Sequence, residues 1–245
     1  MIGTLYGIGV GTGDPELITV KGLRLLQKVS IVVFPAGVAG KPGIAEQIVS
    51  PWLSNNQQKL ALCFPYIQDE QLLQQAWQEA AKQVWTYLQL NHDVAFVCEG
   101  DISFYSTFTY LAQTLTDLHP EAIVERVPGI CSPMAAAASV GVPLTVRSDR
   151  LAILPALYVA AELEAVLAWA DVVVLMKVSS VYEQVWQVLQ QYDLLDRAWI
   201  VERATFPDQK IYRNLRDRPS LELSYFSLLL VYNRQARSLA ELKDM

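Results

Sequence analysis

A single stretch of the chain, residues 94–108 (VAFVCEGDISFYSTF), joins a short apolar run to an abrupt cluster of polar residues. A run of four to eight apolar residues that ends in turn residues is typical of a buried strand. Here the run ends at Glu99, Gly100 and Asp101, and hydroxyl and aromatic residues follow before a helical pattern begins. Open α/β sheets bind ligands at the carboxyl ends of their strands. We therefore predict that this stretch carries the site around which the chain is organised.

Short apolar runs alternate with segments of helical spacing along the whole chain, which indicates α/β architecture. No internal repeat relates the two halves, and Gly141, Val142 and Pro143 interrupt the alternation. We therefore predict two different α/β domains, residues 1–143 and 144–245, that share a cleft. Strands are expected at residues 4–10, 31–34, 60–64, 94–98, 122–127, 151–154, 171–176, 199–202 and 226–232, and helices at 15–28, 44–53, 69–90, 110–115, 134–139, 160–169 and 182–192, with a charged tail at 238–245.

Composition excludes several classes of protein. With 52% hydrophobic and 18% charged residues the chain can bury a large core, and its net charge of −6 argues against a broad nucleic-acid surface. Cys63, Cys98 and Cys131 are far apart, and His92 and His119 are the only histidines, so neither a disulfide framework nor a metal site is expected. Because no signal peptide is evident and charged residues or prolines interrupt the apolar stretches, we expect a cytoplasmic protein that does not enter a membrane.

The glycine-rich turn GIGVGTGD at residues 7–14 is similar to a dinucleotide-binding fingerprint. No register of it fits the GxGxxG pattern, because the third glycine position falls on Thr12 or on Asp14. The pattern requires glycine there so that the backbone can approach the pyrophosphate, which disfavours a nicotinamide-dependent oxidoreductase. A tight turn between strand and helix, without any ligand, remains an alternative.

Five motifs occur in an order and spacing that resemble the tetrapyrrole methylases. They are GVGTGDPELITVKG (9–22), EGDISFYSTFTYL (99–111), VPGICS (127–132), VVLMKV (173–178) and VERAT (201–205). The resemblance covers nearly the whole chain and implies a homodimeric, two-domain α/β methyltransferase with a cleft for S-adenosylmethionine between its domains. Within the family, GDISFYSTFTYL and YFSLLLV are most similar to members that methylate carbon 20 of precorrin-2 or cobalt-precorrin-2 in cobalamin biosynthesis.

The resemblance also implies which residues contact the cofactor. A carboxylate and exposed backbone suit its polar ends, and Phe104 and Met176 offer apolar contact. Two positions depart from the family pattern, since Thr12 and Ile102 stand where many relatives have proline. Taken alone, Asp101 could simply cap a following helix. Carried over by motif, the cofactor-binding residues are Thr12, Glu99, Gly100, Asp101, Phe104, Cys131, Ser132, Met176 and Ala204.

The implied reaction is direct displacement of the sulfonium methyl group by an electron-rich carbon of the tetrapyrrole. Because the cofactor is already activated, the protein mainly aligns the two reactants and excludes water. Glu99 and Tyr105 are the candidates for steering a proton, and Glu99 could equally be a structural carboxylate. Relatives that methylate uroporphyrinogen III have an acidic residue at the end of the second strand. Pro35 occupies that place here and cannot accept a proton, which disfavours that activity.

A tetrapyrrole with carboxylates around its rim requires cations in the cleft, and arginine is best suited to bind a carboxylate through two contacts. Each candidate could equally be a solvated surface residue. Two further functions remain open, namely a methyltransferase of the same fold that acts on another tetrapyrrole, an RNA or a protein, and a binding module without catalysis. The candidate substrate-binding residues are Arg147, Arg150, Lys177, Arg203, Lys210 and Arg213.

Overall fold

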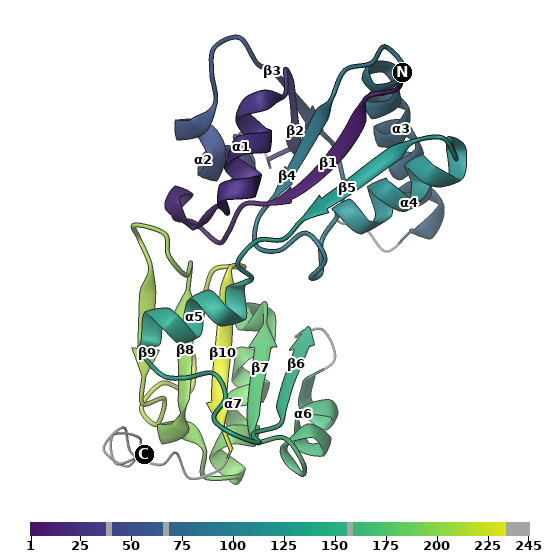
Figure 1. Cartoon of the computed structure of the whole chain (residues 1–245). Helices are drawn as coiled ribbons and strands as arrows, with labels where there is room; N and C mark the ends of the chain where they lie inside the picture. The colour runs from purple at the N-terminus through teal and green to yellow at the C-terminus, as the bar shows by residue number, and fades with distance from the viewer. Residues whose placement is uncertain (38–40, 66–68, 156–158, 234–245) are drawn as a thin grey trace. The chain divides into compact units, whose positions relative to one another are not determined.

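The computed structural model describes residues 1–37, 41–65, 69–155 and 159–233. The chain divides into two compact units, Met1–Cys131 and Ser132–Met245, and each contains a five-stranded sheet (Figure 1). This confirms the predicted two-domain α/β fold. Within the described ranges no helix is long and apolar enough to cross a membrane, and no group of three or more His, Cys, Asp and Glu side chains could hold a metal ion. The expected tail at 238–245 lies outside these ranges.

The division between the units precedes α5 (Ser132–Val140), whereas the sequence places a boundary at Gly141, Val142 and Pro143. Helix α5 contacts strands β8 and β10 of the second unit. These contacts explain why the helix is grouped with the second sheet. A break in the sequence pattern marks the end of the helix and gives no information about the sheet on which it packs.

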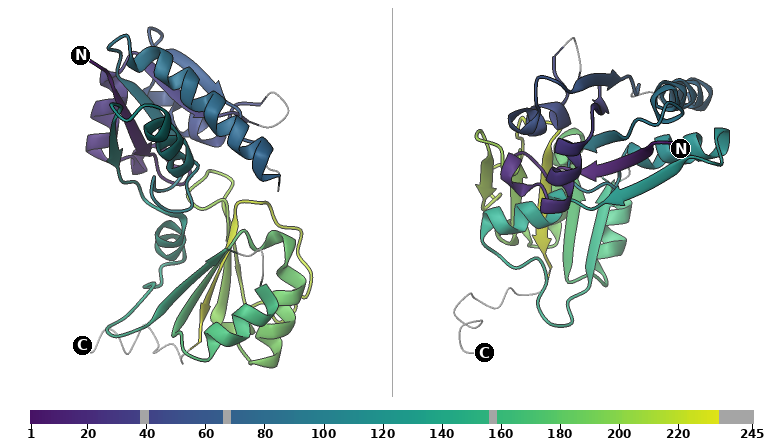
Figure 2. Two further views of the ribbon diagram at one scale, coloured as in Figure 1. Left: turned by 90° about the vertical axis from the view of Figure 1, so that its right-hand side faces the viewer. Right: turned by 45° about the horizontal axis from the view of Figure 1, so that its top comes forward.

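The first sheet is entirely parallel, with the strand order β3-β2-β4-β1-β5. Helices α3 and α4 pack on one face through a core that includes Val84, Leu88, Phe108 and Leu111, and α1 and α2 cover the other face (Figure 2). Strand β1 lies between β4 and β5, so the loops that follow these three strands are neighbours. The elements are β1 (Thr4–Gly9), α1 (Val20–Lys28), β2 (Ile31–Pro35), α2 (Ile44–Val49), β3 (Gln58–Leu62), α3 (Glu70–Leu88), β4 (Val94–Cys98), α4 (Phe108–Leu118) and β5 (Ile123–Val127), with 3-10 helices at Pro15–Leu17 and Ser50–Trp52.

The helix expected at residues 15–28 is interrupted. Asp14 caps only the 3-10 turn Pro15–Leu17, by accepting a hydrogen bond from the Glu16 backbone N–H. Thr19 then has an extended backbone, and its hydroxyl accepts a hydrogen bond from the Gly22 N–H and so begins α1. Threonine is a favoured N-cap residue, and this second cap is the reason for the break.

The second sheet is mixed, with the strand order β6-β7-β10-β8-β9. Strand β10 is antiparallel to both of its neighbours, whereas β6 and β7 are parallel. Helices α6 and α7 pack on one face around Leu163, Tyr182, Val185 and Leu189, and α5 lies on the other face (Figures 1 and 2). The elements are β6 (Leu151–Pro155), α6 (Val159–Leu167), β7 (Val172–Met176), α7 (Tyr182–Gln191), β8 (Ala198–Glu202), β9 (Lys210–Arg213) and β10 (Ser227–Tyr232), with 3-10 helices at Val178–Ser180 and Leu195–Arg197.

The register of the second sheet defines two edges. Met176 pairs with Leu228, Ser227 pairs with Glu202, and Glu202 pairs with Lys210, so the carboxyl ends of β7 and β8 lie together. We call this the Met176 edge. The opposite edge contains the residues that precede β6 and β7, together with the end of β9, and we call it the Asp171 edge. Strands of five residues separate the two edges by about 15 Å.

Candidate active site

Backbone hydrogen bonds join the loops that follow β1 and β4 in the first unit. The Gly100 N–H donates to the Gly11 carbonyl at 2.6 Å, and the Gly11 N–H donates to the Gly100 carbonyl at 3.2 Å. Both residues have positive φ, 82° at Gly11 and 72° at Gly100, a conformation that glycine adopts without steric cost. The glycine turn and the EGD motif, which are far apart in the sequence, therefore form one substructure.

A third backbone segment, the loop after β5, lies against the same point. A Cβ added at Gly129 would be 2.3 Å from the Gly100 carbonyl oxygen, and a Cβ added at Gly9 would be 2.7 Å from that atom. Side chains cannot fit at either position, so the ends of three strands meet with only backbone between them. This close packing fixes the three loops at the carboxyl ends of their strands, which is where open α/β sheets bind ligands.

Asp101 connects the loops that follow β4 and β5. Its Oδ2 accepts a hydrogen bond from the Gly129 N–H at 2.8 Å, and its Oδ1 accepts from the Ser103 N–H at 2.9 Å and the Ser103 hydroxyl at 2.5 Å. Burial alone would raise the pKa of this carboxyl, but the hydrogen bonds from Ser103, Gly129 and Ile102 outweigh it and hold the pKa below its usual value. The carboxylate is thus charged at neutral pH. Asp101 does not cap α4, which begins only at Phe108.

The remaining candidates of the first unit lie around this substructure. Glu99 and Phe104 are half-buried, whereas the Tyr105 side chain is 56% exposed. Tyr105 has φ of 50°, which is unusual for a residue with a side chain, and its ring contacts the Phe104 ring edge to face at 4.8 Å. The first unit thus brings together the predicted residues Thr12, Glu99, Gly100, Asp101, Phe104, Tyr105 and Cys131, and a Cβ on Gly100 would lie 3.9 Å from the Cys131 Cα.

The predicted residues of the second unit are divided between its two edges. Met176, Lys177, Arg203, Ala204 and Lys210 are at or next to the Met176 edge, and Ser132 is the first residue of α5. Lys177 and Arg203 both have positive φ, 55° and 51°. Arg203 has an ion pair at 2.8 Å from its Nε to Asp208, and its guanidinium stacks over the Phe206 ring at 4.1 Å. Much of its charge is therefore already compensated.

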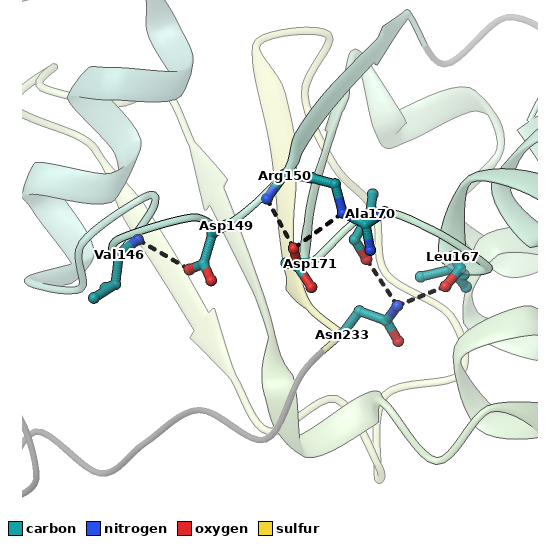
Figure 3. Close-up of polar contacts among 7 residues, drawn as sticks. All are labelled: Val146, Asp149, Arg150, Leu167, Ala170, Asp171 and Asn233. Carbon is teal, nitrogen blue, oxygen red and sulfur yellow. Dashed lines mark hydrogen bonds and ion pairs between the residues drawn. The ribbon is translucent and has the colours of Figure 1, made fainter.

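The other three predicted substrate-binding residues, all arginines, lie at or toward the Asp171 edge. The Arg150 N–H and Nε both donate to Asp171 Oδ2, at 2.8 and 3.5 Å, at the Asp171 edge (Figure 3). Arg147 lies in the loop that leads to Arg150, and Arg213 ends β9 and donates to the Val140 carbonyl at 3.2 Å. The sequence interpretation grouped these arginines with Lys177. The strand directions place them about 15 Å away, at the opposite end of the sheet.

Sequence reasoning did not identify a polar cluster buried at the Met176 edge. Glu202 is 7% exposed, and its carboxylate accepts hydrogen bonds from the Tyr212 hydroxyl at 3.1 Å and the Ser224 N–H at 3.2 Å. Among the described residues, the buried side-chain polar atoms without a partner are the hydroxyl oxygens of Ser224 and Ser227. Buried polar groups are normally satisfied, and two orphaned hydroxyls beside Met176 and Ala204 are consistent with a site completed by a ligand. The only sequence signal was the polar residues in VERAT and YFS.

Cys98 ends β4 within the core, 3% exposed, with its Sγ 3.1 Å from the Ser106 hydroxyl. Burial raises the pKa of this thiol to about 12, with Glu99 and Asp101 acting in the same direction against the Ser106 hydrogen bond. Since only the thiolate is nucleophilic, we expect a maleimide at pH 8 to modify exposed Cys63 rapidly and Cys98 only after unfolding. Peptide mass spectrometry would locate the label, with Cys63→Ser as the control. Fast labelling of native Cys98 would contradict the prediction.

The chain is similar to several known proteins in fold and in sequence. The solved structure of uroporphyrin-III C-methyl transferase from Thermus thermophilus, complexed with S-adenyl homocysteine, has the same fold, with a TM-score of 0.67 and 20% identity over 94% of this chain and 92% of that one. Cobalt-precorrin-2 C(20)-methyltransferase of Salmonella typhimurium is 34% identical over 96% of this chain and 98% of its own length. Cobalamin biosynthesis protein CobIJ of Mycobacterium bovis is 33% identical over 97% of this chain.

The chain spans about half of the length of the mycobacterial relative, 47%, and nearly the whole length of the Salmonella one. The sequence model of the family described as Tetrapyrrole (Corrin/Porphyrin) Methylases matches residues 4–218. The matched range includes all five motifs and every predicted site residue, which confirms the family predicted from those motifs. The chain belongs to the tetrapyrrole (corrin/porphyrin) methylases.

Proposed function

We propose that the chain transfers a methyl group from S-adenosylmethionine to carbon 20 of precorrin-2, or of cobalt-precorrin-2, in cobalamin biosynthesis. The observation that carries the proposal is the 34% identity with the Salmonella cobalt-precorrin-2 C(20)-methyltransferase over 96% of this chain and 98% of that protein. A match of this extent includes both units and nearly the whole length of that relative. The absence of an acidic residue at Pro35 further supports a substrate other than uroporphyrinogen III.

The residues at the strand ends of the first unit fit the cofactor. When bound, S-adenosylmethionine supplies an activated methyl group that an electron-rich carbon can displace directly. The backbone of the loops that carry Gly100 and Gly129 would bind its polar ends through peptide groups other than the Gly100 N–H and carbonyl and the Gly129 N–H, which are hydrogen-bonded within the protein. Asp101 holds the two loops that carry these peptides in a fixed arrangement. In the second unit, Met176 and Ala204 would provide apolar contact, and the hydroxyls of Ser224 and Ser227 have unused hydrogen-bonding capacity.

The chemical role of the protein is then mainly to orient and to shield the reactants, an effect that can contribute several kcal/mol. Proton transfer is the remaining task. The carboxylate of Glu99 would take up the proton that the methylated carbon loses, or the Tyr105 hydroxyl would steer that proton through a hydrogen bond. Tyr105 is held in a positive-φ conformation, and a strained backbone at a candidate site is a common feature of functional residues. Lys177 and Lys210, with Arg203, would face the substrate carboxylates.

We further propose that the protein is a cytoplasmic homodimer, as the family resemblance implies. Light scattering coupled to size-exclusion chromatography should give twice the mass of 27.4 kDa. A monomer at micromolar concentration would contradict the dimer and would leave the proposed reaction unaffected.

The reaction is tested with isotopically labelled S-adenosylmethionine and, in parallel, metal-free and cobalt-bearing precorrin-2. Mass spectrometry should detect the addition of one methyl group, and NMR should locate it at carbon 20. The preferred substrate would identify the metal-free or cobalt-dependent route. If neither substrate is methylated while the cofactor binds, the substrate proposal fails, and other tetrapyrroles, RNA and protein become the next substrates to test.

A further inference from the structure

Lys177 is held in an unusual conformation immediately after β7. Its backbone is left-handed, with φ of 55° and ψ of 39°, which is costly for a residue with a side chain. The side chain is half-buried, and its Nζ lies 5.1 Å from the centroid of the Tyr225 ring. This distance is within the range of a cation–π interaction, in which the ring face attracts an ammonium group. The left-handed backbone of Lys177 and the Tyr225 ring together fix the position of the ammonium group.

Tyr225 is itself held from both sides. It belongs to the segment 214–226 between β9 and β10. On one side, the Ser224 N–H donates to Glu202 Oε1 at 3.2 Å, and on the other, the Phe226 carbonyl accepts from the Arg203 N–H at 2.7 Å. The Tyr212 hydroxyl donates to the second oxygen of Glu202 at 3.1 Å and so fixes this buried carboxylate. The backbone on both sides of Tyr225 is therefore anchored to the carboxyl end of β8.

The kind of contact distinguishes Lys177 from two of the other candidate cations, Arg203 and Arg150. Arg203 and Arg150 have carboxylate partners, Asp208 and Asp171, whereas none of the ion pairs within the described ranges includes Lys177. An aromatic face does not neutralise an ammonium group and does not occupy its N–H donors. Lys177 thus retains the capacity to form charged hydrogen bonds at the Met176 edge.

We propose that Tyr225 positions the Lys177 ammonium group to bind a carboxylate on the rim of the tetrapyrrole, and that Glu202 is a positioning residue that acts through Tyr225. The inference rests on the proposed function and assigns a substrate contact within it. Lys177 binds the substrate, and neither Tyr225 nor Glu202 needs to touch the reacting atoms. Substitution of Tyr225 should therefore affect substrate binding much more than the rate of the chemical step.

The test compares Tyr225→Leu, which removes the ring, with Tyr225→Phe, which keeps it, and with Lys177→Met. Tyr192→Leu is a matched control, because Tyr192 is also 44% exposed in the same unit but follows α7. We expect the KM for the tetrapyrrole to rise about three- to tenfold in Tyr225→Leu and about ten- to a hundredfold in Lys177→Met. In Tyr225→Phe and Tyr192→Leu the KM for the tetrapyrrole should stay within about twofold of the wild-type value. In all four variants the KM for S-adenosylmethionine and kcat should be unchanged.

A direct binding measurement separates this inference from the proposed reaction. Fluorescence titration with uroporphyrin III, a stable tetrapyrrole with carboxylates around its rim, should show the same order of Kd values without any methyl transfer. The double variant Tyr225→Leu/Lys177→Met should bind no more weakly than Lys177→Met. Glu202→Ala, which removes both hydrogen bonds of the carboxylate, should match Tyr225→Leu. The inference would be overturned if the effects of Tyr225→Leu and Lys177→Met on the Kd were additive in the double variant. It would also be overturned if Tyr225→Leu raised the KM for S-adenosylmethionine as much as the KM for the tetrapyrrole, or if Tyr225→Leu bound uroporphyrin III with wild-type affinity. If methyl transfer is absent but the binding order holds, only the proposed reaction fails.

Discussion

Replacement of Gly129 by alanine is expected to destabilise the first unit by about 3 kcal/mol or more and to abolish cofactor binding. The added Cβ would lie 2.3 Å from the Gly100 carbonyl oxygen and 2.6 Å from the Gly9 carbonyl carbon, and both are backbone atoms. Backbone cannot rotate away as a side chain can, so the strand ends must separate. That movement would also break the hydrogen bond of 2.8 Å between the Gly129 N–H and Asp101.

Chemical unfolding followed by circular dichroism would measure the loss of stability, and isothermal titration calorimetry would measure the binding of S-adenosylmethionine. Pro128→Ala is the control, because it changes the adjacent exposed residue of the same loop without adding an atom at the contact. We expect this control to change the free energy of unfolding by about 1 kcal/mol or less. Wild-type stability and cofactor affinity in Gly129→Ala would show that the strand ends can separate, and would refute the close backbone contact.

The first-unit site could be predicted from the sequence because each of its residues lies in a short contiguous motif. In a parallel sheet every strand has the same direction, so residues that follow apolar runs collect at one edge. The resemblance to the tetrapyrrole methylases, carried over by motif, implied that Thr12, Asp101 and Cys131 belong to one site, and the parallel sheet explains why these residues lie at the same edge. The contact between Gly100 and Gly129 was not predictable, since it depends on how closely two loops approach in space.

In the second unit the positions of particular residues could not be predicted from the sequence. Strand β10 is inserted antiparallel between β7 and β8, and a run such as YFSLLLV gives no information about its direction. Strand β9 has only four residues, none of them buried, and no apolar pattern predicts it. Without β9, Arg213 could not be placed at the Asp171 edge. Glu202 was missed because a glutamate is normally exposed, and its burial depends on hydrogen bonds from Tyr212 and Ser224.

Asp101→Asn is expected to destabilise the protein by about 2 kcal/mol at pH 7 and to weaken cofactor binding at least tenfold. The asparagine side chain has a single acceptor oxygen and cannot serve both the Gly129 N–H and the Ser103 donors, whereas the carboxylate does so at 2.8 and 2.9 Å. Asp69→Asn is a matched control, because Asp69 also accepts hydrogen bonds from two backbone N–H groups, those of Gln71 and Leu72, at the start of α3. Asparagine caps helices as well as aspartate does, so this control should change stability by less than about 0.5 kcal/mol.

The effect of Asp101 should also depend on pH. Burial raises the pKa of its carboxyl, but the hydrogen bonds from Ser103 and Gly129 lower the pKa by a larger amount. The folded-state pKa is therefore below the ordinary value of 3.8. A carboxyl of this kind contributes its stability above the unfolded-state pKa and loses it as the pH falls through the folded-state pKa. The difference in unfolding free energy between wild type and Asp101→Asn should therefore be constant from pH 5 to 7 and shrink below about pH 4. Urea unfolding across this range would measure it, and a difference that stays constant down to pH 3 would mean that the charge of Asp101 is not what joins the two loops.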